Sequence, residues 1–177
     1  MSIRRELLQE LDRIDFPQQG TRYNIKRGGI EPTGFVLGKV RNRGSGLKFD
    51  KRVIRDSKRT HTPKYKDVYK LAVKLMRDHD PKFKFSSIQV NKNNRTAKHI
   101  DGNNVGFSYI TGLGDYTGGA LKVYDEEGRK PRYYNLKNKW AYFNGSQRPH
   151  ETEPFTGDRY TLVYYDLTKG VEHLLKE

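Results

Sequence analysis

Three side chains of this sequence could bind one metal ion: two histidines and an aspartate. His99 and Asp101 are two positions apart in residues 96–101, which we predict to be a β-strand. Because side chains two positions apart on a strand point to the same face, both can reach one centre. His150, in a later predicted strand over residues 148–152, supplies a third ligand. The sequence therefore predicts a metal centre of two imidazole nitrogens and one carboxylate.

Such a ligand set favours iron and leaves room for reactants. Two histidines and one carboxylate on one face of the ion form the facial triad of non-haem Fe(II) oxygenases, with open positions for a bidentate co-substrate and O₂. An anionic co-substrate also needs a cation. Arg159 lies nine residues after His150, and Thr161 follows two positions later on the same predicted strand. A guanidinium can hold a carboxylate through two parallel hydrogen bonds and a hydroxyl can add a third, so we expect Arg159 and Thr161 to bind the co-substrate.

At these residues the sequence resembles the Fe(II)/2-oxoglutarate-dependent dioxygenases. The resemblance covers about residues 84–166 and is carried by His99-Ile100-Asp101, Gly114-Asp115-Tyr116-Thr117-Gly118-Gly119-Ala120-Leu121, His150 and Arg159-Tyr160-Thr161. It implies a mainly β protein with flanking helices (α+β), in which N-terminal helices precede a double-stranded β-helix, the jelly-roll or cupin-like core. It also implies that Fe(II), 2-oxoglutarate and O₂ are the cofactors, with ascorbate as a candidate reductant. His99, Asp101 and His150 would then be both metal ligands and catalytic residues.

Within that superfamily, residues 99–121 look most like the TET and JBP branch, which hydroxylates thymine and methylcytosine. The shared pattern is His-x-Asp-Gly, a hydrophobic strand containing glycine, Leu-Gly-Asp, and then Gly-Gly-x-Leu. That branch also uses an arginine to hold 2-oxoglutarate, the role that Arg159 would have here. The chain contains no cysteine, so it lacks the cysteine-rich region of the animal methylcytosine enzymes, and disulfides and zinc–thiolate sites are excluded.

Other residues are candidates for contacts inside the same site. Asn91 on the first core strand, Tyr109 on the following hydrophobic strand and Asn144 in the Asn144-Gly145 turn are predicted to bind the cofactor. An aromatic side chain near the mouth could also stack on a flipped base, and three are candidates: Tyr116, Tyr23 and Phe35.

The charge distribution indicates an acidic partner. The chain has 35 Lys and Arg against 21 Asp and Glu, which gives a net charge of +14. Residues 39–66 alone hold 11 basic and 2 acidic side chains. A basic cluster of this kind is typical of proteins that bind a polyanion. We therefore predict a nucleic acid, DNA or RNA, as the partner, with these substrate-binding residues: Arg41, Arg43, Lys48, Lys51 and Arg52.

Three other readings of the same residues stay open. The same chemistry on an acidic protein would make the chain a peptidyl hydroxylase of the prolyl type. A basic binding module that keeps the β core without catalysis is another, although the intact triad and Arg159 argue against it. A free small molecule is a third possible substrate, but it would not explain the positive charge of the chain. Formation of succinate distinguishes an enzyme from a binding module, and binding of nucleic acids and acidic peptides distinguishes the two substrate classes.

We expect residues 1–177 to fold as one domain that holds these residues in place. Apolar stripes at helical spacing predict helices over residues 2–14 and 65–77. Residues 1–80 form a helical and basic support region, residues 81–168 the β core and residues 169–177 a tail. Core strands are predicted near residues 83–91, 96–101, 106–112, 120–125, 131–136, 139–143, 148–152 and 158–166, with an earlier strand over 33–40 and a basic loop over 41–63. With no membrane span and no signal peptide in the sequence, we expect a soluble intracellular protein.

Overall fold

The computed structural model describes residues 1–20, 22, 25–28, 30–41, 54–102 and 104–168. The helices are α1 (Ile3–Asp12) and α2 (Pro63–His79), with the 3-10 helix η2 (Lys58–His61) before α2. The strands are β1 (Gly34–Arg41), β2 (Ile54–Asp56), β3 (Ser87–Lys92), β4 (Ser108–Leu113), β5 (Tyr116–Gly118), β6 (Leu121–Val123), β7 (Arg132–Tyr134), β8 (Trp140–Phe143), β9 (His150–Thr152), β10 (Phe155–Gly157) and β11 (Tyr160–Tyr165). Within the described ranges, no helix is both long and apolar enough to cross a membrane.

The two α-helices begin where the sequence provides a suitable first turn. In α1 the Ser2 hydroxyl caps the helix by accepting the backbone N–H of Arg5 at 3.2 Å. In α2 the first position is Pro63, which has no N–H to leave unsatisfied. Each helix then buries one apolar stripe: Leu7 and Leu11 in α1, and Tyr65, Val68, Ala72, Leu75 and Met76 in α2.

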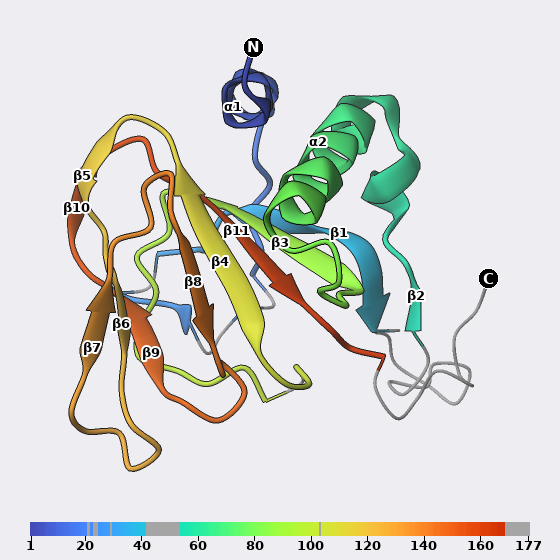
Figure 1. The fold of residues 1–177 in the computed structure, drawn as a ribbon. Helices are drawn as coiled ribbons and strands as arrows, with labels where there is room; N and C mark the ends of the chain where they lie inside the picture. Colours follow the sequence, from blue (N-terminus) through green and yellow to red (C-terminus); the bar gives the residue numbers. More distant parts are fainter. Residues whose placement is uncertain (21, 23–24, 29, 42–53, 103, 169–177) are drawn as a thin grey trace.

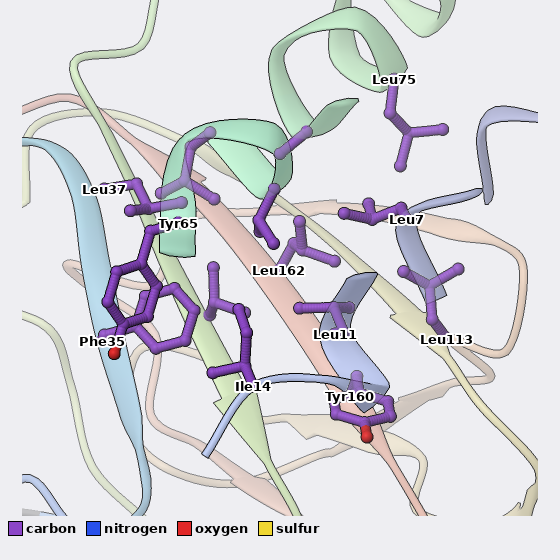
Figure 2. Close-up of a cluster of buried hydrophobic side chains, with 14 of the residues drawn as sticks. Leu7, Leu11, Ile14, Phe35, Leu37, Tyr65, Leu75, Leu113, Tyr160 and Leu162 are labelled. Carbon is purple, nitrogen blue, oxygen red and sulfur yellow. The ribbon is translucent and has the colours of Figure 1, made fainter. Parts of the chain in front are cut away.

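Both helices lie on one face of a large antiparallel sheet with the strand order β2-β1-β3-β11-β4-β8 (Figure 1). Their stripes meet side chains from four strands of this sheet, and Figure 2 shows the central part of that cluster. The sheet residues in it are Phe35, Leu37, Ile88, Val90, Leu113, Tyr160, Leu162 and Tyr164.

The other face of the large sheet is available for the site because strand residues alternate in direction. Leu162 and Tyr164 of β11 pack against the helices, so Thr161 and Val163 point to the opposite face. In register, Thr161 pairs with residue 91 of β3 and residue 112 of β4, and Val163 pairs with residues 89 and 110. Directly paired residues share a face, so these two rows of side chains form the inner surface of the sheet.

Two smaller sheets complete the β structure: β7-β6-β9 and β10-β5. A second apolar cluster joins β6 to the inner face of the large sheet, through Leu121 and Val123 on one side and Ile110, Ala141 and Phe143 on the other. The predicted mainly β fold with flanking helices is therefore confirmed.

Three segments differ from the sequence predictions. The predicted strand over residues 96–101 is wrong, because this segment has a single β-bridge, between His99 and His150, and no strand. Strands β5 and β10 were not predicted, since each has three residues and ends in glycine, which has low β-propensity. Part of the predicted basic loop over 41–63 forms β2 and η2, while residues 42–53 lie outside the described ranges.

Replacing Leu162 with alanine should strongly destabilise the fold. The Leu162 side chain is fully buried between the sheet and the helices, and a Leu→Ala change at such a site costs about 2–5 kcal/mol. Denaturant unfolding followed by circular dichroism and by the fluorescence of Trp140 should show this loss in one shared transition. Tyr133→Ala is the control, since Tyr133 is 58% exposed. A loss below about 1 kcal/mol for Leu162→Ala would contradict this packing.

Candidate active site

The His99, Asp101 and His150 side chains meet at one point. The Nε2 atom of His99 lies 3.4 Å from Oδ1 of Asp101, and the Nε2 atom of His150 lies 3.2 Å from Oδ2 of Asp101. One ligand atom from each residue lies within 4.8 Å of the other two, which makes the group able to hold a metal ion. The three residues predicted as metal ligands therefore lie side by side in the fold.

Backbone hydrogen bonds, rather than strand alternation, position the three ligands. His99 and His150 exchange two backbone bonds, N–H of His99 to the carbonyl of His150 at 3.0 Å and the reverse at 2.9 Å. The N–H of Asp101 donates to the carbonyl of Gly145 at 2.8 Å. A Cβ on Gly145 would lie 3.2 Å from Oδ2 of Asp101 and 3.3 Å from Cε1 of His150. The turn before β9 thus passes close beside the ligands, and a larger residue at 145 would crowd them.

A hydrogen bond at Nδ1 of each imidazole determines which ring nitrogen faces the other ligands. Nδ1 of His99 lies 2.6 Å from the carbonyl oxygen of Ala97, and Nδ1 of His150 lies 2.9 Å from that of Arg148. A carbonyl oxygen only accepts hydrogen bonds, so each Nδ1 carries a proton. Each Nε2 is therefore the nitrogen directed at Asp101, which is the arrangement that orients histidine ligands in metal sites.

The electrostatics of the centre keep Asp101 ionised. Burial alone would raise the pKa of this carboxyl, but the hydrogen bonds and the charges of His150 and His99 lower it far below its usual range. A divalent cation would bind the same nitrogen and carboxylate oxygen atoms that protons bind, so metal binding should compete with acid. Two imidazole nitrogens and a charged carboxylate oxygen form a donor set that suits Fe(II). The residues present therefore fit such an ion.

The triad lines a cavity of about 540 Å³ between the large sheet and β6 and β9. Part of its wall is apolar and consists of Val36, Ile110, Leu121, Phe143 and Val163. Its polar and basic residues include Arg159, which directly precedes β11, and Thr161 of β11, as well as Gln89 and Asn91 from β3. The metal triad and the predicted anion clamp therefore face one space.

Arg159 carries a buried charge without an acidic partner. Arg159 is only 3% exposed, and its Nε and Nη2 atoms donate to the carbonyl of Gly119 at 3.2 and 2.9 Å. Burial lowers the pKa of Arg159 to about 10, so the guanidinium still carries its charge at neutral pH. Within the described part of the chain, no carboxylate forms an ion pair with it. A buried charge needs a counterion, and a carboxylate ligand in the cavity would supply one.

Tyr116 places a hydroxyl group near Arg159, behind the residues that line the cavity; the guanidinium carbon lies 5.8 Å from the centroid of its ring. Gly112 pairs in register with Thr161, so a Cβ on Gly112 would point to the face that carries Thr161, and it would lie 2.3 Å from the Tyr116 hydroxyl oxygen. That hydroxyl is buried and has no hydrogen-bond partner among the described residues. Burial raises the pKa of Tyr116 in spite of the nearby charge of Arg159, so the group stays protonated and can donate. Arg159, Thr161 and Tyr116 together fit a carboxylate.

Of the other predicted cofactor contacts, the structure brings one to the cavity. Asn91 lines it and donates from Nδ2 to the Thr161 hydroxyl at 3.0 Å. Tyr109 lies on the opposite, helix-facing side of the sheet, where its hydroxyl donates to Asp80 at 3.1 Å. Asn144 lies in the β8–β9 turn, where it accepts from the Ser146 hydroxyl at 2.7 Å, and it does not line the cavity.

The predicted substrate-binding and base-stacking residues also include some that line the cavity and some that do not. Arg41 lines the cavity, whereas Arg43, Lys48, Lys51 and Arg52 lie outside the described residues, as does Tyr23. Phe35 is buried against the helices, so it cannot stack on a base at the mouth. Tyr116 is buried behind the clamp and does not line the mouth.

One arginine of the cavity wall was not predicted from the sequence. Arg22 lines the cavity and donates from Nη1 to Oδ1 of Asn91 at 2.9 Å. It comes from a loop far from β3 in the sequence, and no periodic pattern connects the two. Only the folded chain brings Arg22 to this place.

The sequence matches no protein-family model and no curated protein. Several solved structures are similar in fold. An oxidoreductase of the 2OG-Fe(II) oxygenase family from Burkholderia pseudomallei has a TM-score of 0.60 at 15% identity, covering 91% of this chain and 76% of that one. NgTET1 in complex with 5mC DNA has a TM-score of 0.56 at 12% identity, covering 93% and 67%.

A third similar structure is a prolyl hydroxylase from Trichoplax adhaerens in complex with a hypoxia inducible factor peptide fragment. Its TM-score is 0.53 at 14% identity, covering 96% of this chain and 80% of that one. All three likenesses extend over almost the whole chain, although the identities are low. The chain therefore has the fold of the 2-oxoglutarate and Fe(II) oxygenases.

Proposed function

We propose that the protein is an Fe(II)- and 2-oxoglutarate-dependent dioxygenase that hydroxylates a C–H bond of a nucleobase or nucleotide in DNA or RNA. One observation carries this proposal: the three metal-ligand side chains face the same cavity as a buried arginine that has no acidic partner among the described residues. We further propose that the two antiparallel layers form a double-stranded β-helix and that the chain works as one domain.

In this proposal His99, Asp101 and His150 hold Fe(II), and Arg159, Thr161 and Tyr116 hold the far carboxylate of 2-oxoglutarate. When bound, the metal and 2-oxoglutarate supply the oxidising chemistry, in which O₂, 2-oxoglutarate and substrate become succinate, CO₂ and hydroxylated substrate. The chain itself orients the reactants. Val163, Ile110 and the other apolar wall residues exclude water from the space between the ligands and the clamp.

A nucleic acid substrate is supported by charge. The net charge of +14 and the basic stretch over residues 39–66 favour a polyanion. NgTET1, which has a similar fold, was solved with 5mC DNA. The prolyl hydroxylase of similar fold was solved with a peptide, so an acidic peptide is the competing substrate.

The experiment that tests the function is anaerobic loading with Fe(II) and 2-oxoglutarate, followed by exposure to O₂ with DNA, RNA or an acidic peptide pool. Succinate should form in step with a gain of one oxygen atom on a nucleoside, detected by mass spectrometry after digestion. Oxidation confined to the peptides would replace the nucleic acid substrate with a protein. A complete absence of 2-oxoglutarate turnover would contradict the dioxygenase itself.

Loss of a metal ligand should abolish turnover without unfolding the protein. Asp101→Ala and His150→Ala each remove one of three ligands, so Fe(II) affinity should fall by more than the about tenfold to hundredfold that follows loss of a ligand's outer hydrogen-bond partner, and no succinate should form. Calorimetric titration with Fe(II) under anaerobic conditions measures the affinity. His79→Ala is the matched control, because His79 stacks on Trp140 on the other side of the sheet, with ring centroids 4.5 Å apart. Full activity of His150→Ala would rule out the triad.

Arg159→Gln should raise the concentration of 2-oxoglutarate needed for turnover. Loss of a buried charged partner of a carboxylate costs about 2–5 kcal/mol, which corresponds to about thirtyfold or more in affinity. Arg132→Gln on β7 is the control, since Arg132 is exposed. Arg159→Lys, which keeps a positive charge, should recover part of the loss. An unchanged dependence on 2-oxoglutarate in Arg159→Gln would assign the clamp to another cation.

Tyr116→Phe separates binding from stability. The Tyr116 hydroxyl is buried without a hydrogen-bond partner among the described residues, so its removal should leave the free energy of unfolding unchanged or slightly higher. If the hydroxyl donates to 2-oxoglutarate, affinity for it should fall by about 1 kcal/mol, roughly fivefold. Denaturant unfolding and 2-oxoglutarate titration measure the two effects. Unchanged affinity would remove Tyr116 from the clamp.

A further inference from the structure

The cavity has a second basic end, away from Arg159. Arg41 of β1, Arg55 of β2 and Arg59 of η2 all line it. Arg55 pairs in register with Val40, and because paired residues share a face, both point to the cavity. Among the described residues that line the cavity, Asp101 is the only acidic one. The field at this end is therefore strongly positive.

The backbone around these arginines is fixed to β1. Gly38 has a φ of +85°, and a Cβ there would lie 2.4 Å from the carbonyl oxygen of Ser86. Its N–H donates to the buried Thr60 hydroxyl at 2.9 Å, and its carbonyl accepts the N–H of the buried Ser57 at 2.7 Å. These two bonds hold the chain on both sides of Arg59. The arginines thus lie in a part of the cavity wall whose backbone is held by hydrogen bonds to β1.

The acidic residue next to Arg55 does not neutralise it. Asp56 pairs in register with Lys39, on the face opposite to Arg55, and the two side chains form an ion pair at 2.7 Å. Arg55 donates only to the backbone carbonyl of Asp56, at 3.0 Å, and Arg59 lies over the ring of Tyr65 at 5.7 Å. Within the described ranges, neither arginine forms an ion pair. Their charge remains available to an anionic ligand.

This end is too far from Arg159 to serve the same carboxylate. Thr161 marks the clamp end of β11 and Tyr165 the other end, where it pairs with Ser87, which in turn pairs with Gly38. Four residues of strand correspond to about 13 Å, and Val40 and Arg55 lie beyond Gly38. A five-carbon diacid held at Arg159 is shorter than that. The cavity therefore contains two separate places for an anion.

We propose that Arg55 and Arg59 bind a phosphate group of the substrate, with the attached base directed toward the metal triad. This inference rests on the proposed function. Arginine forks match the geometry of phosphate oxygens, and an enzyme that acts on a base must take the nucleotide out of the stack and into its pocket. The phosphate can come from a free nucleotide or from a phosphodiester in a strand.

The test compares two variants that each lose two positive charges: Arg55→Gln/Arg59→Gln, and Lys70→Gln/Lys74→Gln as the matched control. Lys70 and Lys74 are exposed residues of α2 that lie outside the basic stretch and do not line the cavity. The probes are single-stranded oligothymidylate, thymidine monophosphate, thymidine, and an acidic peptide of the same charge as the oligonucleotide. Affinities are measured over a range of salt concentrations, without Fe(II) or 2-oxoglutarate.

The Arg55→Gln/Arg59→Gln variant should bind oligothymidylate at least about tenfold more weakly. The slope of log affinity against log salt should fall by about 1.4, since each lost contact with a single strand contributes about 0.7. The control should change affinity less than about threefold. Competition by thymidine monophosphate but not by thymidine would identify a free nucleotide as a sufficient source, and competition by the oligonucleotide alone would identify a strand.

Two results would overturn the phosphate subsite: equal losses in the two variants, or binding of the acidic peptide as tight as that of the oligonucleotide. Because these measurements do not involve the iron, they are independent of turnover. A protein that fails to oxidise any substrate, yet binds oligothymidylate through Arg55 and Arg59, would contradict the proposed function and leave the subsite standing.

Discussion

Strands β3 and β11 each have one face in the core under the helices and the other face on the cavity, and this division fixes the register of the large sheet. Leu162 and Tyr164 must fill the core under the helices, and the strand period then forces Thr161 and Val163 onto the other face. Burial of the apolar set is worth several kcal/mol per large side chain, so the register cannot slip by one residue without exposing it. The helices thus stabilise the sheet from one side and leave the other side free to line a cavity.

The metal centre depends on a different contact, between two segments that are far apart in the sequence. The paired backbone bonds of His99 and His150 bring the segment after β3 against β9, and the Asp101 N–H is held by the turn at Gly145. Each imidazole is then oriented by a carbonyl two residues before it in the chain. The three ligands are therefore fixed by backbone geometry, whereas the clamp at Arg159 and Thr161 is fixed by the sheet.

Much of the candidate site could be predicted from residue types and order, and the errors have physical reasons. The triad, Arg159 and Thr161 were found because each lies in a recognisable pattern. Tyr109 was assigned to the wrong face of β4. Tyr109 and Thr111 are two positions apart and therefore share a face, but the sequence alone does not say whether that face contacts the helices or the cavity. Arg22 and the role of Tyr116 depend on contacts across the fold, through Asn91 and Gly112, that no local pattern encodes.

In the proposed function, one cavity holds Fe(II) and 2-oxoglutarate together, between the triad and Arg159. Anaerobic addition of both to the protein, followed by visible absorption spectroscopy, tests this most directly, because chelation of Fe(II) by a 2-keto acid gives a charge-transfer band. We expect the band only when both are present, and we expect it to be lost in Asp101→Ala. Absence of the band at saturating Fe(II) and 2-oxoglutarate, or its persistence in Asp101→Ala, would contradict the claim.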